Sequence, residues 1–171
     1  MEARDLLAVT AAAQAAGVTV ALVEQPYRVA GRRSAAPAHQ LDAAWIAVLE
    51  RLRARELAGL PLATGGRSSG ARVACRTAAA TGAAGVVCLA FPLHPPRRAP
   101  DAPPNTRLPE LEAVPVPVLV VQGTGDRFGM PPAAPRRTVV AVAGDHALRA
   151  DPPAVAAAVI GWLRDLFKLG S

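Results

Sequence analysis

Ser68 is the first residue whose setting points to chemistry. It is the central residue of Gly66-Arg67-Ser68-Ser69-Gly70, which has the G-x-S-x-G pattern. The apolar residues Pro61–Thr64 precede this motif, and the helix-forming residues Ala71–Ala80 follow it. The pattern therefore predicts a serine on a sharp turn between a strand and a helix, where its hydroxyl is available for nucleophilic attack.

The neighbours of Ser68 fit this interpretation. Such a turn strains the serine backbone and brings strand and helix so close that the residues two before and two after must be small, as Gly66 and Gly70 are. Ser68 would then lie at a helix N-terminus, whose partial positive charge favours an anion, with the backbone N–H of Ser69 as an oxyanion donor. A phosphate loop would need Lys-Ser or Lys-Thr where this chain has Ala71-Arg72, and the dinucleotide pattern G-x-G-x-x-G is not matched. Small residues are also common at ordinary strand–helix turns, so the motif needs support from elsewhere.

That support comes from Asp126 and His146. Asp126 lies just past the apolar run Val116–Gln122, and His146 lies just past Thr138–Ala143. Alone, Asp126 could shape a turn and His146 could be an ordinary loop residue. Together, the order Ser, Asp, His, each after its own strand, is that of a hydrolytic triad on an α/β sheet. Ser68 would attack a carbonyl, His146 would accept and return the proton, and Asp126 would fix the imidazole tautomer.

The elements that must position these residues alternate along the chain. Continuous apolar runs rich in β-branched residues are typical of strands buried on both faces. We expect five strands, over Val18–Val23, Pro61–Thr64, Gly85–Phe91, Val116–Gln122 and Thr138–Ala143. Helices are predicted over Leu6–Ala16, Leu41–Ala58, Ala71–Ala80 and Pro153–Phe167. This alternation predicts an α/β fold with a mostly parallel sheet flanked by helices, in which sites lie beyond the carboxyl ends of the strands.

The 171 residues fit one domain over 1–171. Its last four residues, Lys168–Ser171, have the composition of a cloning remnant. The proline-rich segment from Pro92 to about Pro115 shows no periodicity, and a loop of this length is usually functional or mobile.

Several stretches together resemble one family. They are Gly65–Ala74, Phe91–Pro96, Val121–Asp126 and Gly144–His146, and the loop Pro26–Arg33 fits as well. With these motifs the chain resembles the small lidless α/β-hydrolases of the KANSL/TEX type, which are related to dienelactone hydrolases, from Leu6 to Leu166. The resemblance implies a serine-hydrolase fold with Ser68, Asp126 and His146 as the triad. It implies no particular substrate, and the branch includes members that act as complex subunits.

The resemblance also implies a strand and a loop that the sequence does not show, which makes this a truncated α/β-hydrolase fold. Such proteins begin with strands ending in a His-Gly-rich loop whose N–H is the second oxyanion donor; here Met1 falls roughly where the following helix begins. By analogy the missing strand would lie between Val18–Val23 and the strand at Leu62. We expect a natural start upstream, direct pairing of these two strands, or a gap filled in another way. Losing one oxyanion donor costs about a hundred- to thousand-fold in turnover.

Four residues near the expected strand ends are candidate pocket residues, namely Leu93, His94, Tyr27 and Arg28. A histidine in such a loop is nevertheless more often an ordinary loop residue than a ligand of the substrate. His39 is expected in solvent. Arg97 and Arg98 could attract an anionic substrate, although solvated charges are the commoner case.

Two tryptophans and two cysteines are assigned to the protein interior. Trp45 and Trp162 lie on predicted helix faces and are expected to pack in the core. Cys75 and Cys88 are expected to be buried small apolar residues. Histidine, cysteine and aspartate do not cluster at metal-ligand spacing, so we predict no metal and no cofactor.

Composition narrows the partners. Apolar residues make up 51% of the chain and charged residues 19%, which excludes disorder over most of it. The net charge is +6, but the basic residues are almost all arginines scattered along the chain, and the aromatic content of 4% leaves little to stack on bases. We therefore expect no nucleic-acid partner. No apolar stretch is long enough for a membrane span and no leader pattern is visible, so we expect no membrane partner and a cytoplasmic, reducing location.

The sequence thus predicts a serine hydrolase that cleaves a small ester or thioester through an acyl-enzyme intermediate. The expected partner is the small ester substrate, and an exposed strand edge would invite a homo-oligomer. The alternative is a catalytically weak hydrolase-like domain that acts as a protein-interaction module. The order of the triad favours the enzyme, whereas the absent oxyanion loop favours the module.

Overall fold

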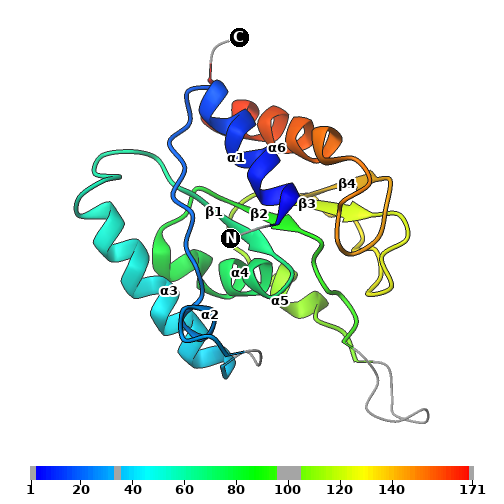
Figure 1. Cartoon of the computed structure of the whole chain (residues 1–171), viewed down its shortest axis with the longest axis horizontal. Coiled ribbons are helices and arrows are strands. Elements are labelled where there is room, and N and C mark those ends of the chain that lie inside the picture. Colours follow the sequence, from blue (N-terminus) through cyan, green and yellow to red (C-terminus); the bar gives the residue numbers. More distant parts are fainter. Residues whose placement is uncertain (1–2, 33–35, 96–104, 170–171) are drawn as a thin grey trace.

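Four parallel strands in the spatial order β1-β2-β3-β4 form the centre of the molecule (Figure 1). The computed structural model describes residues 3–32, 36–95 and 105–169. The strands are β1 (Ala63–Arg67), β2 (Gly85–Leu89), β3 (Val118–Gly123) and β4 (Arg137–Val142). In the sheet register Gly65 lies opposite Val87, and Val87 lies opposite Leu119. The predicted α/β fold with a parallel sheet is confirmed.

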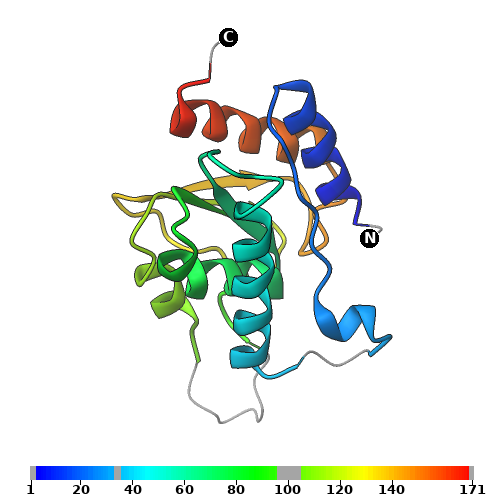
Figure 2. The same ribbon diagram turned by 90° about the vertical axis from the view of Figure 1, so that its left-hand side faces the viewer.

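Helices cover both faces of this sheet (Figures 1 and 2). On one face α1 (Arg4–Ala15) packs along α6 (Pro152–Phe167). On the other face lie α4 (Ser69–Thr81), α5 (Leu108–Glu112) and α3 (Ala38–Arg53), the last packed against α4. The short helix α2 (Pro26–Val29) lies between α1 and α3 in the chain.

Alternate residues of β2 and β3 supply two separate cores. Successive side chains of a strand point to opposite faces, so each strand contributes to both layers. Val86, Cys88, Val118 and Val120 pack toward α4 and α5, whereas Val87, Leu89, Leu119 and Val121 pack toward α1 and α6. All eight are buried, which explains why these two strands read as continuous apolar runs.

Three boundaries differ from those expected. Strand β1 starts at Ala63 and continues through the two glycines to Arg67, because the serine turn begins only after the last pairing residue. The helix predicted over Leu41–Ala58 starts earlier and ends at Arg53. The loop predicted from Pro92 to about Pro115 contains α5, whose side chain Leu111 is buried in the core.

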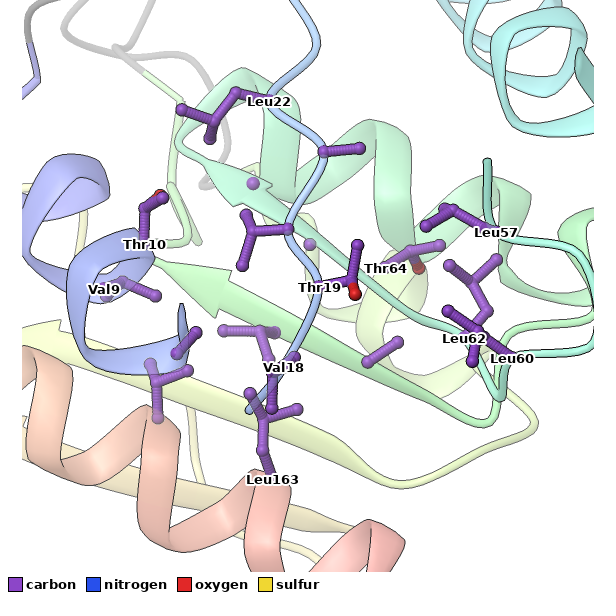
Figure 3. Close-up of a pocket in the computed structure, with 18 of the residues that line it drawn as sticks. Val9, Thr10, Val18, Thr19, Leu22, Leu57, Leu60, Leu62, Thr64 and Leu163 are labelled. Carbon is purple, nitrogen blue, oxygen red and sulfur yellow. The ribbon is translucent and has the colours of Figure 1, made fainter. Parts of the chain in front are cut away.

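The predicted first strand, Val18–Val23, is wrong. The segment runs past β1 without joining the sheet, and Leu22 is 45% exposed. Its apolar, β-branched residues favour an extended backbone, but a strand also needs a partner within hydrogen-bonding distance. Here an apolar groove separates the segment from β1 (Figure 3). Direct pairing between these two segments is therefore excluded.

Candidate active site

Ser68 occupies the sharp turn between β1 and α4. Its backbone has φ 52° and ψ −110°, in the left-handed region that L-residues adopt at a cost in energy. Its N–H donates to the carbonyl oxygen of Leu89 at 2.9 Å, which anchors the turn to β2. The strained turn predicted from the sequence is thus present in the structure.

The two glycines of the motif differ in their surroundings. A Cβ at Gly66 would lie 2.5 Å from the carbonyl carbon of Gly70 and 2.9 Å from the backbone nitrogen of Ala71. Strand and helix therefore touch at this point, and only glycine fits. A Cβ at Gly70 would meet no atom within 4 Å. The expectation that both positions must be small is correct for Gly66 and wrong for Gly70, because Gly70 contributes its backbone, not its side-chain position, to the contact.

The structure brings Ser68, His146 and Asp126 into one hydrogen-bonded chain. The Oγ atom of Ser68 lies 2.9 Å from Nε2 of His146, and Nδ1 of His146 lies 2.8 Å from Oδ2 of Asp126. A carboxylate can only accept at that site, so Nδ1 donates to Asp126 and Nε2 is left to accept from the serine hydroxyl. This is the tautomer that a general base needs. Ser68 follows β1, Asp126 follows β3 and His146 follows β4, so all three lie at the carboxyl edge of the sheet.

Asp126 is held by more than the histidine. Its side chain is fully buried, and Oδ2 also accepts from the side-chain amide of Gln122 at 2.8 Å. Its other oxygen, Oδ1, accepts from the backbone N–H of Phe128 at 2.9 Å. These three donors compensate the desolvation of the buried charge and fix the carboxylate orientation. The Phe128 ring also packs edge-on against His146, with centroids 4.5 Å apart.

Two glycines let the loops of Asp126 and His146 approach each other. A Cβ at Gly123, the last residue of β3, would lie 2.5 Å from the carbonyl oxygen of Asp145. Gly144 has φ 117°, a conformation that favours glycine, and its carbonyl accepts from the N–H of Gly125 at 2.8 Å. The loop after β4 thereby packs directly on the end of β3 and brings His146 to Asp126.

A second contact ties the His146 loop to α1. Arg67 donates from Nη2 to the carbonyl oxygen of His146 at 3.1 Å, and its Nε lies 2.9 Å from Oδ2 of Asp5. The Asp5 side chain is only 2% exposed, and Arg67 is the cation that lies against it. The pair is a close ion pair without hydrogen-bond geometry, since Nε and Oδ2 are both left without a hydrogen-bond partner. Arg67 thus joins the serine turn, the histidine loop and α1.

The predicted oxyanion donor lies where the turn meets the helix. Ser69 is the first residue of α4, and its N–H has no backbone acceptor in the part of the chain that the structure describes. The first N–H groups of a helix lack partners within the helix and carry its positive dipole end. The Ser69 N–H is therefore free to donate beside the serine hydroxyl.

The structure places the four predicted pocket residues in three different settings. Leu93 is buried in the core beside α4 and α5. His94 is exposed, and its Nδ1 lies 3.3 Å from the carbonyl oxygen of Asn105. Tyr27 and Arg28 lie in α2. Their part in a substrate pocket stays a prediction.

Gln122 and Asp5 are not among the residues predicted for the site, although each contacts it. Gln122 is the one polar side chain in β3 and is fully buried, and a polar residue inside a buried apolar run is a signal that it has a specific partner. Asp5 lies near a helix start, where acidic residues are common, so nothing in the surrounding sequence indicates that it has a specific partner.

The predicted interior residues and the remaining basic residues lie in different settings. Cys75 and Cys88 are buried, with their sulfurs 3.4 Å apart, as expected. Trp45 and Trp162 are each half-buried, Trp162 against the core beside α6. His39 is exposed. Arg97 and Arg98 lie outside the described residues.

Residues 3–32, 36–95 and 105–169 show neither a metal cluster nor a membrane span. None of the groups of His, Cys, Asp and Glu side chains there could hold a metal ion. Over the same ranges, every helix is too short or too polar to cross a bilayer.

The chain belongs to the alpha/beta hydrolase domain family, because the family model with that description matches residues 1–150. This family agrees with the parallel sheet and with a serine turn after β1. A comparison with curated proteins found no match.

Several solved structures share this fold. A structure from the metagenome-derived lipolytic enzymes LipS and LipT matches with a TM-score of 0.70 and 15% identity, over 94% of this chain and 88% of that one. XC6422 from Xanthomonas campestris, a serine hydrolase without a lid, matches with a TM-score of 0.64 and 20% identity, over 95% and 75%. A serine hydrolase homologue from Coxiella burnetii matches with a TM-score of 0.65 and 14% identity, over 95% and 77%. At these identities the likeness concerns the fold, and the family supports hydrolase activity in general.

Proposed function

We propose that this chain is a serine hydrolase that cleaves a small ester or thioester through an acyl-enzyme intermediate. The observation that carries the proposal is the unbroken hydrogen-bonded chain from Ser68 through His146 to Asp126. We also propose that it belongs with the lidless KANSL/TEX type. Two observations support this: the motifs in its sequence, and its likeness to a hydrolase without a lid.

The reaction follows from the roles that the three side chains can take. As Oγ of Ser68 forms a bond to the substrate carbonyl carbon, Nε2 of His146 accepts the hydroxyl proton. Asp126 stabilises the resulting imidazolium through Nδ1. Collapse of the tetrahedral intermediate breaks the bond to the alcohol or thiol, which takes the proton from His146. Water then attacks the acyl-enzyme by the same route and releases the carboxylic acid and free Ser68.

The negative oxygen of the tetrahedral intermediate needs donors. The N–H of Ser69 and the dipole of α4 supply one favourable group beside Ser68. Each donor of this kind is worth about a hundred- to thousand-fold in turnover.

Neighbouring serines provide a matched test. Ser68→Ala removes the nucleophile, whereas Ser69→Ala makes the same chemical change but keeps the backbone N–H. With p-nitrophenyl acetate, we expect Ser68→Ala to lose turnover by about a thousand-fold or more and Ser69→Ala to stay within a few-fold of the parent. Unchanged hydrolysis by Ser68→Ala would reject the proposal.

A second candidate function is a protein-interaction module with weak catalysis. One observation favours it: within the described residues β1 pairs with β2 alone, and its other side borders an apolar groove. If Ser68→Ala and the parent hydrolyse esters equally slowly while the groove binds a partner, this candidate replaces the first.

A further inference from the structure

A cavity of about 360 Å³ lies at the amino edge of the sheet, at the opposite end of the strands from Ser68. It is bounded by the last residues of α5, by the first residue of β3 and by the turn that leads into β4. Its volume falls within the range of small-molecule sites. The residues that line it combine a buried apolar part with charged side chains, namely Leu111, Val114 and Val118 with Glu112, Arg136 and Arg137.

Arg137 is the residue of this cavity that points to a ligand. It is the first residue of β4, only 7% exposed, and the only buried arginine among the described residues. In the sheet register it lies opposite Val118, so its side chain is on the face that carries α4 and α5. Its Nε donates to the carbonyl oxygen of Pro132 at 2.7 Å. Within the described part of the chain this is its one side-chain hydrogen bond, so the N–H groups on both Nη atoms have no acceptor there.

Arg137 also differs from the other arginines of the interior in having no carboxylate beside it. Three arginines whose side chains are between 20% and 28% exposed each lie against a carboxylate, in the pairs Arg67–Asp5, Arg72–Glu110 and Arg76–Asp42. Among the described residues no carboxylate lies within ion-pair distance of Arg137, although it is the most buried of the four. A buried cation without an opposite charge is costly, so an anion in the cavity would stabilise it.

The backbone around Arg137 is fixed by the protein itself. Its N–H donates to the carbonyl oxygen of Ala134 at 2.9 Å, and its own carbonyl accepts from the N–H of Ala134 at 3.1 Å. The carbonyl of Arg136 accepts from the N–H of Val118 at 2.8 Å, which joins the turn to β3. Because Nε is bound to Pro132 as well, the guanidinium is held in place, and binding an anion costs little conformational entropy.

Two other charged side chains determine which kind of anion suits the cavity. Arg136 lines it, is exposed and adds a second cation. Glu112 also lines it and is exposed, and it makes no ion pair with the described residues. Two arginines and one glutamate leave a single positive charge, which suits a monoanion better than a phosphate dianion. The buried apolar part of the lining suits a hydrocarbon group on the same ligand.

We propose that this cavity binds a small monocarboxylate with a short hydrocarbon body, whose carboxylate lies on the Nη groups of Arg137. A guanidinium can donate two parallel hydrogen bonds to the two oxygens of a carboxylate, which favours this anion over a spherical one. The hydrocarbon body packs on Leu111, Val114 and Val118. The site lies at the other end of the sheet from Ser68, and the proposal does not rest on the proposed function.

The test follows the amide signals of the isotope-labelled full chain by NMR during titration with sodium hexanoate at constant ionic strength. Hexanamide is the matched control ligand, because it has nearly the same shape and no charge, and inorganic phosphate is the control anion. Arg137→Gln removes the buried cation. Arg136→Gln and Glu112→Gln change exposed charges at the cavity, and Arg51→Gln makes the same change as Arg136→Gln on an exposed residue of α3 outside it.

We expect saturable shifts of the Val118 and Arg137 amide signals with a Kd of about 1 mM, and the same shifts in Ser68→Ala. Arg137→Gln should weaken binding at least about tenfold. Arg136→Gln should weaken it about two- to fivefold and Glu112→Gln should strengthen it by a similar factor. These two variants change exposed side chains, so they test the proposal even where Arg137→Gln does not fold.

Four results would each overturn the proposal. Hexanamide or phosphate could bind as tightly as hexanoate, or hexanoate could fail to saturate the signals up to about 20 mM. Arg136→Gln and Arg51→Gln could bind hexanoate with equal affinity. Shifts confined to residues around Ser68 would place the carboxylate in the candidate active site as a reaction product, which would contradict this site while leaving the proposed function intact.

Discussion

Gly66→Ala tests whether contact between β1 and α4 sets the position of the nucleophile. The new Cβ would lie 2.5 Å from the backbone of Gly70, whereas ordinary contact begins near 3.4 Å. The strand and the helix must therefore separate by up to about 0.9 Å, since backbone atoms cannot rotate away. Overpacking of this kind costs about 1–3 kcal/mol of unfolding free energy. A 1 Å error in the position of a reacting group costs about a hundred-fold in turnover.

Gly70→Ala is the matched control, because its Cβ would meet nothing within 4 Å. Alanine in place of glycine within α4 should stabilise the helix by about 0.5–1 kcal/mol. The measurements are thermal unfolding by circular dichroism and hydrolysis of p-nitrophenyl acetate. We expect Gly66→Ala to lower Tm by several degrees and turnover by about a hundred-fold, with Gly70→Ala near or above the parent in both. Equal values for the two variants would refute the steric argument.

Three further predictions concern the groups around the site. Asp126→Asn puts an amide where three donors converge, and we expect turnover to fall by about 10⁴-fold with p-nitrophenyl acetate. Arg67→Met leaves the buried Asp5 without its cation and should cost about 3 kcal/mol in urea unfolding, much of it recovered by adding Asp5→Asn. The hydrogen bond with Cys75, together with burial, raises the pKa of the Cys88 thiol well above its ordinary value. The unfolded chain loses that proton first, so stability should fall above about pH 8.5, and less steeply in Cys88→Ala.

The positions of Ser68, Asp126 and His146 could be read from the sequence for a physical reason. Each follows an apolar run directly, and parallel strands bring all their carboxyl ends to one edge of a sheet. Local sequence therefore places each of the three residues at that edge. Their proximity then follows from the parallel sheet, and no long-range contact has to be predicted. The steric demand at Gly66 is local too, since it arises from a turn of a few residues.

The Val18–Val23 segment shows where local sequence stops being sufficient. Its β-branched residues favour an extended backbone, but whether an extended segment becomes a strand depends on what lies beside it. Here the nearest strand is across the groove, so the segment remains half-exposed and unpaired.

The ion pair of Asp5 with Arg67 was beyond sequence reasoning as well. The two residues lie far apart in the chain, and only the packing of α1 over the sheet brings them together. Gln122 is partly predictable. Its burial could be inferred from its place in the apolar run of β3, but its partner Asp126, in the turn that follows, could not.

Labelling with a fluorophosphonate probe, followed by mapping of the modified peptide, tests the proposed nucleophile most directly. We expect one adduct on Ser68 in the native protein, none after denaturation, and none in Ser68→Ala. An adduct on another residue, or a native protein that stays unlabelled while a known serine hydrolase reacts under the same conditions, would contradict the proposal.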